Sequence, residues 1–123
     1  MRDFRKLTIW NLSIDLVVII YKVTSRFPDS EKFGLQSQMR RASVSIPSNI
    51  AEGCSRAGQM DFKRFLEISL GSLFELESQL IISEKLNYIE MGYLEEILQI
   101  VNGLQKQINN LISKIKIENS NKS

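Results

Sequence analysis

Residues 38–53 read QMRRASVSIPSNIAEG, and this stretch and the residues just before it carry two stripes at helical spacing. The apolar stripe recurs at steps of three and four, which places it on one face of a helix and predicts that it lines a core. A polar stripe runs beside it at similar steps. Exposed helix faces are normally filled by Lys and Glu at no fixed interval, so a regular polar stripe is unusual. The apolar stripe is Leu35, Met39, Ala42, Ile46 and Ile50, and the polar stripe is Gln38, Arg41, Ser45, Asn49 and Glu52.

Pro47 lies inside this predicted helix. Proline has no N–H and its ring clashes with the carbonyl four residues earlier, here that of Ser43, so we expect a bend. Both stripes stay in register beyond it, and we therefore expect the helix to resume. Gly53 fits a stop in the left-handed conformation.

Three further stretches have a helical pattern. Residues 7–26 are apolar on nearly every side and end before Pro28. Residues 60–86 carry Gly71 in their middle, for which we expect the close approach of a neighbouring backbone, and Asn87 suits the helix end. Residues 94–115 repeat apolar positions at threes and fours, as in a bundle seam. No stretch alternates with period two for long enough to form a sheet. The sequence predicts an all-α, up-down four-helix bundle, with one domain over residues 1–116 and a disordered tail over 117–123.

The helix predicted over residues 7–26 has two apolar stripes, and a four-helix domain of this size can bury only one of them. The surplus stripe predicts a subunit interface. The alternative is a very hydrophobic core helix in a monomer. One stripe consists of Leu7, Trp10, Ile14, Val17, Val18 and Tyr21, and the other of Ile9, Leu12, Leu16, Ile19, Ile20 and Val23.

The residue types present exclude several kinds of active site. The 123 residues include no His and one Cys, so imidazole metal sites, Ser/His triads, Cys/His pairs and zinc clusters cannot be built. A di-iron bundle needs Glu-x-x-His repeats, which are absent. We therefore expect no catalytic residue, no metal and no cofactor. The longest apolar run, residues 16–21, is too short to span a bilayer, and the lone Cys54 fits a reducing compartment, which together predict a cytoplasmic protein.

Charge is distributed unevenly along the chain. The net charge is +2, but residues 1–64 hold eleven Lys/Arg against six Asp/Glu and residues 65–123 hold five against eight. Such an asymmetry permits a basic face, which indicates nucleic-acid binding. The alternative is complementary pairing between the two halves of the chain.

The polar stripe predicts a network between the second and third helices. If they are antiparallel and their turn is centred near residues 56 and 57, Arg41 faces Ser72 with Glu75 one turn away. A half-buried arginine needs a carboxylate, so we expect an ion pair between Arg41 and Glu75. We interpret the network as structural, fixing helix register, rather than as a ligand site. Its expected members are Gln38, Arg41, Ser45, Asn49, Glu52, Ser72 and Glu75.

The sequence as a whole also resembles a known protein family. The matching positions are Phe4, Leu7, Trp10, Phe27-Pro28, Glu31, Leu35, Gln38, Arg41, Ser45-Ile46-Pro47, Asn49-Ile50-Ala51-Glu52-Gly53, Arg56, Gly71-Ser72 and Glu75-Leu76. They resemble the four-helix-bundle proteins encoded in intervening sequences of bacterial 23S rRNA genes, a superfamily that includes the accessory protein of diversity-generating retroelements. The resemblance covers nearly the whole chain. It implies a homo-oligomer, with barrel-shaped pentamers as the known arrangement, RNA or DNA binding, and no catalytic activity.

Two classes of function follow. In the first, the protein binds RNA or DNA through phosphate contacts from Arg56, Lys63 and Arg64 at the corner between the second and third helices. Arg40 and the N-terminal Arg2, Arg5 and Lys6 are expected to add to these contacts. No aromatic side chain is interleaved with these charges, so we expect binding that is largely independent of sequence. In the second, the assembled protein is a scaffold that docks a partner protein such as a reverse transcriptase, without nucleic-acid binding of its own.

Overall fold

The computed structural model describes residues 2–121 as an all-α chain. Two short 3₁₀ helices, η1 (Phe4–Lys6) and η2 (Asp29–Glu31), accompany four α-helices. The α-helices are α1 (Thr8–Thr24), α2 (Leu35–Cys54), α3 (Gln59–Lys85) and α4 (Met91–Ser120). The described residues contain no strand. The predicted fold class is confirmed.

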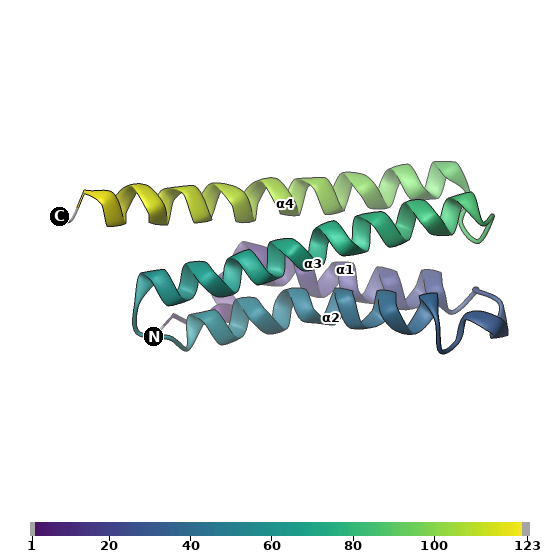
Figure 1. Ribbon diagram of the computed structural model, residues 1–123, viewed down its shortest axis with the longest axis horizontal. Helices are drawn as coiled ribbons and strands as arrows, with labels where there is room; N and C mark the ends of the chain where they lie inside the picture. Colours follow the sequence, from purple (N-terminus) through teal and green to yellow (C-terminus); the bar gives the residue numbers. More distant parts are fainter. Residues whose placement is uncertain (1, 122–123) are drawn as a thin grey trace.

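The four helices alternate in direction around one core (Figure 1). α1 and α3 each pack against both α2 and α4, which makes an up-down four-helix bundle. We call one end of the bundle the terminal end: it holds both chain termini and the α2–α3 connection, residues 2–8, 52–67 and 112–121. The loop end holds the α1–α2 and α3–α4 connections, residues 22–34 and 82–96.

One apolar stripe of α1 is largely buried within the subunit, and the other is partly exposed. Leu16 and Ile20 are completely buried. Val18 and Tyr21, on the other stripe, are 48% and 41% exposed, respectively. The expected surplus of apolar surface on this helix is therefore present in the folded subunit.

Two glycine predictions are wrong. Gly53 does not stop α2 in a left-handed conformation, since α2 continues to Cys54 and no described glycine has a positive φ. Gly53 instead lets α3 approach closely: a Cβ there would lie 2.8 Å from Cβ of Phe65 and 3.0 Å from Cδ1 of Phe62. Gly71, for which the sequence predicts a close approach, is surrounded by open space, and a Cβ there would meet no neighbour within 4 Å. Asn87 does end α3 in the left-handed region, with φ of 64°.

The predicted tail is also partly wrong. α4 continues to Ser120, so residues 117–120 are helical rather than disordered. Residues 122 and 123 lie outside the described part of the chain. Pro47 lies within α2 as expected, and the bend that it predicts stays a prediction.

Candidate functional site

The predicted nucleic-acid corner brings Arg56 and Arg64 together at the terminal end. Their guanidinium groups lie 5.0 and 4.6 Å from the centre of the same Phe65 ring. Lys63 lies on the same turn, but only 13% of its side chain is exposed. Phe65 thus has two cations within cation–π range of its ring.

Each cation of this corner has a carboxylate neighbour. Arg56 lies 3.2 Å from Glu52, Lys63 lies 3.1 Å from Glu67, and Arg64 lies 3.7 Å from Asp61. The two arginine pairs are about half exposed on both sides, so water screens them and a phosphate can compete for the guanidinium groups.

Arg2 adds a further cation at the terminal end. Its guanidinium lies 4.0 Å from the centre of the Phe62 ring, and its backbone N–H donates to the carbonyl of Cys54 at 3.3 Å. The N-terminal segment is thereby joined to the end of α2 and the start of α3. Sequence spacing does not reveal this contact, because it joins segments that lie far apart along the chain.

Charge separates between the two ends of the bundle. The described residues of the terminal end hold eight Lys/Arg against five Asp/Glu, whereas the loop end holds four against six. The asymmetry along the sequence becomes a polarity along the bundle, because the N-terminus, the α2–α3 corner and the end of α4 lie together (Figure 1). The terminal end is the basic end.

Arg40 does not join this corner. Its Nε donates to the hydroxyl of Thr24 at 2.9 Å, its Nη2 donates to the carbonyl of Tyr21 at 3.3 Å, and its guanidinium lies 4.5 Å from the centre of the Tyr21 ring. The Gln36 amide donates to the Thr24 carbonyl at 2.8 Å. These carbonyls also accept from the backbone N–H groups of Ser25 and Phe27 at 3.1 Å, and the bonds from Arg40 and Gln36 add to this cap at the end of α1. Arg40 lies on the face of α2 that meets α1, which the spacing from Ser43 and Pro47 could have indicated.

The centre of the polar stripe forms a hydrogen-bonded group. The hydroxyls of Ser45 and Ser72 lie 2.9 Å apart, and Asn49 Nδ2 donates to the carbonyl and the hydroxyl of Ser45 at 2.8 and 3.0 Å. The sequence predicts that Ser72 faces Arg41, but Ser72 meets Ser45, one helical turn further along α2. Side chains lean toward the N-terminus of their own helix, so in an antiparallel pair the residues that meet are displaced from those level along the backbone.

The expected ion pair between Arg41 and Glu75 is not formed among the described residues. Both side chains are exposed, and together with Gln38, Ala42, Ser45 and Ser72 they line a shallow depression between α2 and α3. The assumption that Arg41 is half-buried is wrong, because it stands at the outer edge of the α2–α3 seam. Glu52, another expected member of the network, forms an ion pair with Arg56 at the α2–α3 corner.

An apolar groove lies between α1 and α2 and continues as an exposed apolar strip along α1. Val17 lines both of its adjoining parts, one toward the start of α1 and one toward its end. We call it the α1–α2 groove; its apolar members are Phe4, Trp10, Ile14, Val17, Val18, Tyr21, Val44, Pro47 and Ala51. The α1 half follows the stripe of Trp10, Ile14, Val17, Val18 and Tyr21; the sequence predicts that one of the two stripes is surplus but not which one. The α2 half was missed, although Val44, Pro47 and Ala51 recur at steps of three and four.

Cys54 is buried in the core at the terminal end of the bundle. Only 1% of the residue is exposed, and burial raises the pKa of its thiol above the usual 9.0. Such a thiol is unreactive in the folded chain. Among residues 2–121, no three Cys or carboxylate side chains come together to hold a metal ion, and no helix is long and apolar enough to cross a bilayer.

The fold and these surfaces define a class of protein, a small helical bundle with one basic end and an unpartnered apolar groove. The sequence model of the 23S rRNA-intervening sequence proteins matches residues 5–110, and the chain belongs to that family. Its fold is similar to that of a protein of unknown function from the S23 ribosomal protein family of Bacteroides thetaiotaomicron, with a TM-score of 0.79 and 24% identity, over 85% of this chain and 95% of that one. No curated protein matches this chain at a significant level. Neither the family's name nor that of the similar structure includes an enzymatic activity.

Proposed function

We propose that this protein is a non-enzymatic, cytoplasmic homo-oligomer that binds RNA or DNA through the repeated basic ends of its subunits. The observation that carries the proposal is the α1–α2 groove, an apolar surface left open by a single subunit. The resemblance to the 23S rRNA intervening-sequence family implies five subunits.

The groove supports self-association because burying its apolar side chains against a second subunit would lower the free energy. Fourteen large hydrophobic side chains are exposed among residues 2–121, but Val18, Tyr21 and Val44 adjoin further apolar side chains along one strip. Contiguous strips of this kind mark protein interfaces, whereas scattered exposed side chains are ordinary. Covering the strip with a second copy removes it from water.

The basic end supports nucleic-acid binding once subunits assemble. The eight Lys/Arg at the basic end of a single subunit are largely offset by five Asp/Glu, and the cations at the corner have carboxylate neighbours. In a closed ring every subunit is related to the next by the same rotation, so all basic ends lie on one rim. Several weak phosphate contacts from one rigid body gain affinity through effective concentration.

Sedimentation of the full chain at micromolar concentration tests assembly, and a fluorescence titration with duplex DNA and structured RNA tests binding. We expect the mass of an oligomer and an affinity that falls steeply with salt, since phosphate contacts release counterions. A monomer mass would overturn the assembly part. An oligomer without affinity even at low salt would overturn the nucleic-acid part.

A protein scaffold is the second candidate, and the loop end favours it. This end is acidic and exposes Phe33 to 90%, along with Leu86 at 47% and Met91 at 50%. Exposed aromatic and methionine side chains are enriched at protein interfaces. Binding to a partner protein such as a reverse transcriptase, by an assembly without affinity for nucleic acid, would establish this reading.

A further inference from the structure

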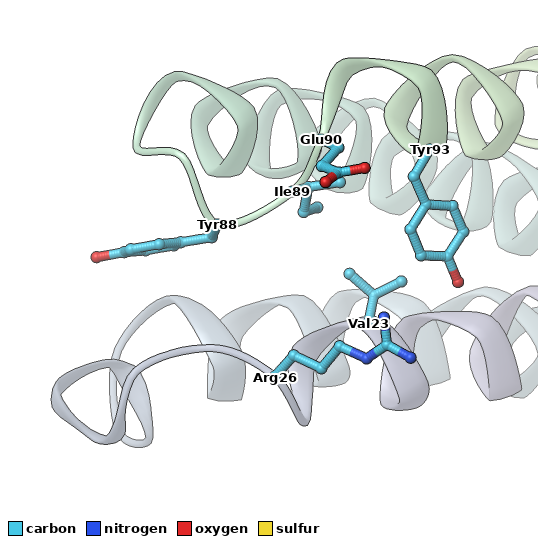
Figure 2. Close-up of a pocket in the computed structure, with 6 residues that line it drawn as sticks. All are labelled: Val23, Arg26, Tyr88, Ile89, Glu90 and Tyr93. Carbon is cyan, nitrogen blue, oxygen red and sulfur yellow. The ribbon is translucent and has the colours of Figure 1, made fainter.

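A small cavity lies at the loop end, away from both the α1–α2 groove and the basic end (Figure 2). Its volume is about 210 Å³, and it lies between the end of α1 and the segment that leads from α3 into α4. Val23 and Ile89, which line it, are 4% and 7% exposed. The cavity therefore has an apolar floor that belongs to the core of the bundle.

Two opposite charges line this cavity from different elements. Arg26 follows α1, and Glu90 immediately precedes α4 (Figure 2). Neither side chain makes an ion pair or a hydrogen bond within residues 2–121. Glu31, another carboxylate of this end, is already engaged, because it accepts hydrogen bonds from the Tyr88 hydroxyl at 3.0 Å and the Leu35 N–H at 3.1 Å. Arg26 and Glu90 are thus both available to a ligand.

Tyr88 and Tyr93 also line the cavity. In Figure 2 the Tyr88 hydroxyl points away from the cavity, whereas the Tyr93 ring descends from α4 toward α1 on the side to which the Arg26 guanidinium reaches. Tyr93 has no hydrogen-bond partner among the described residues, so its hydroxyl is free to donate or accept. The cavity thus combines an apolar floor, an aromatic wall and one group of each charge.

We propose that this cavity binds a free aliphatic α-amino acid. The guanidinium of Arg26 matches a carboxylate, to which it can donate two parallel hydrogen bonds. The carboxylate of Glu90 matches the ammonium group, and the aliphatic side chain packs on Val23 and Ile89. The volume lies below the roughly 300–1,000 Å³ of sites for drug-sized ligands, which suits a ligand of amino-acid size. This site does not depend on the proposed assembly or on nucleic-acid binding.

Calorimetric titration of the full chain with L-leucine, L-valine and L-methionine tests the proposal. We expect saturable binding of at least one of them. N-acetyl-leucine and leucine amide, each of which lacks one of the two charges, should bind at least tenfold more weakly. Arg26→Gln and Glu90→Gln should each weaken binding of the free amino acid at least tenfold. Lys22→Gln and Glu95→Gln remove exposed charges of the same end that do not line the cavity, and should leave binding unchanged.

Three results would overturn the site: no heat from any of the three amino acids at millimolar concentration, equal binding of leucine and its two derivatives, or equal binding by the parent and both cavity variants. The comparison of leucine with its derivatives uses only the parent protein, so it decides the matter even if a variant fails to fold. Sedimentation of the same samples shows whether the oligomer changes, which keeps this outcome separate from that of the assembly proposal.

Discussion

Gly53 is a position in α2 at which an added methyl group would meet the neighbouring helix α3. A Cβ atom added at Gly53 would lie 2.8 Å from Cβ of Phe65. That atom is bonded directly to the backbone of α3, so it can move only if the helix shifts. We expect Gly53→Ala to lower the free energy of unfolding by about 1–3 kcal/mol, as overpacking does. Gly71→Ala is the matched control. Since open space surrounds Gly71, that change should be neutral or should stabilise by about 0.5–1 kcal/mol through helix propensity. Urea unfolding of both variants at matched concentration measures the difference, and equal destabilisation would contradict it.

Arg40 and Arg41 are neighbours in sequence with different surroundings. Arg40 donates to Thr24 and to the Tyr21 carbonyl, so Arg40→Ala should destabilise by about 1.5–3 kcal/mol, the range for hydrogen bonds from charged groups. Arg41→Ala should change stability by less than about 1 kcal/mol, because Arg41 is exposed and unpaired. The same unfolding measurement decides. A larger loss for Arg41→Ala than for Arg40→Ala would indicate that Arg41 is buried by a neighbouring subunit.

Tyr88 gives a spectroscopic readout of the loop end. Its hydrogen bond to Glu31 raises the pKa of the phenol above the usual 10.0. The folded state thus favours the protonated phenol, and the stability it gains is present below pH 10 and is lost as the pH rises through the raised pKa. We expect Glu31→Gln to shift the tyrosinate absorbance titration to lower pH. Superimposable titrations of parent and variant would show that the bond has no effect on ionisation.

At the scale of the element, α1 has two sides with different roles. Leu16 is completely buried in the core, so Leu16→Asp should unfold the chain. Val17, one residue later, lies in the α1–α2 groove, so Val17→Asp should keep the helical signal and release smaller soluble species. Circular dichroism and sedimentation together distinguish the two outcomes. An unchanged oligomer mass for Val17→Asp would place the subunit interface elsewhere.

At the scale of the whole molecule, the difference in charge between the two ends of the bundle leads to a prediction for nucleic-acid binding. Replacing Arg56, Lys63 and Arg64 together with Gln should weaken binding to every sequence and reduce the slope of log affinity against log salt by about 0.9 for each lost duplex phosphate contact. The matched control replaces Arg26, Lys32 and Lys85 with Gln, which removes the same charge from the loop end without touching the α1–α2 groove. Equal losses in the two variants would indicate that only net charge matters, and the basic end would then have no special role.

Much of the fold follows from local pattern. The spacing of apolar residues along α3 and α4 predicts which side faces the core, because a helix repeats every 3.6 residues whatever packs against it. Leu66, Leu73 and Leu76 of α3 are completely buried, as that spacing predicts. The surplus apolar stripe of α1 is visible for the same reason, and so is the polar stripe of α2.

Contacts between helices were decided only by the tertiary structure. The pairing of Ser72 with Ser45 rather than Arg41 depends on the direction in which side chains lean across an antiparallel seam. The close approach at Gly53, the cap that Arg40 places on α1 and the cavity between Arg26 and Glu90 each join segments distant in sequence. Local spacing determines the face on which a residue lies, whereas the offset and the connections of the helices determine what that face meets.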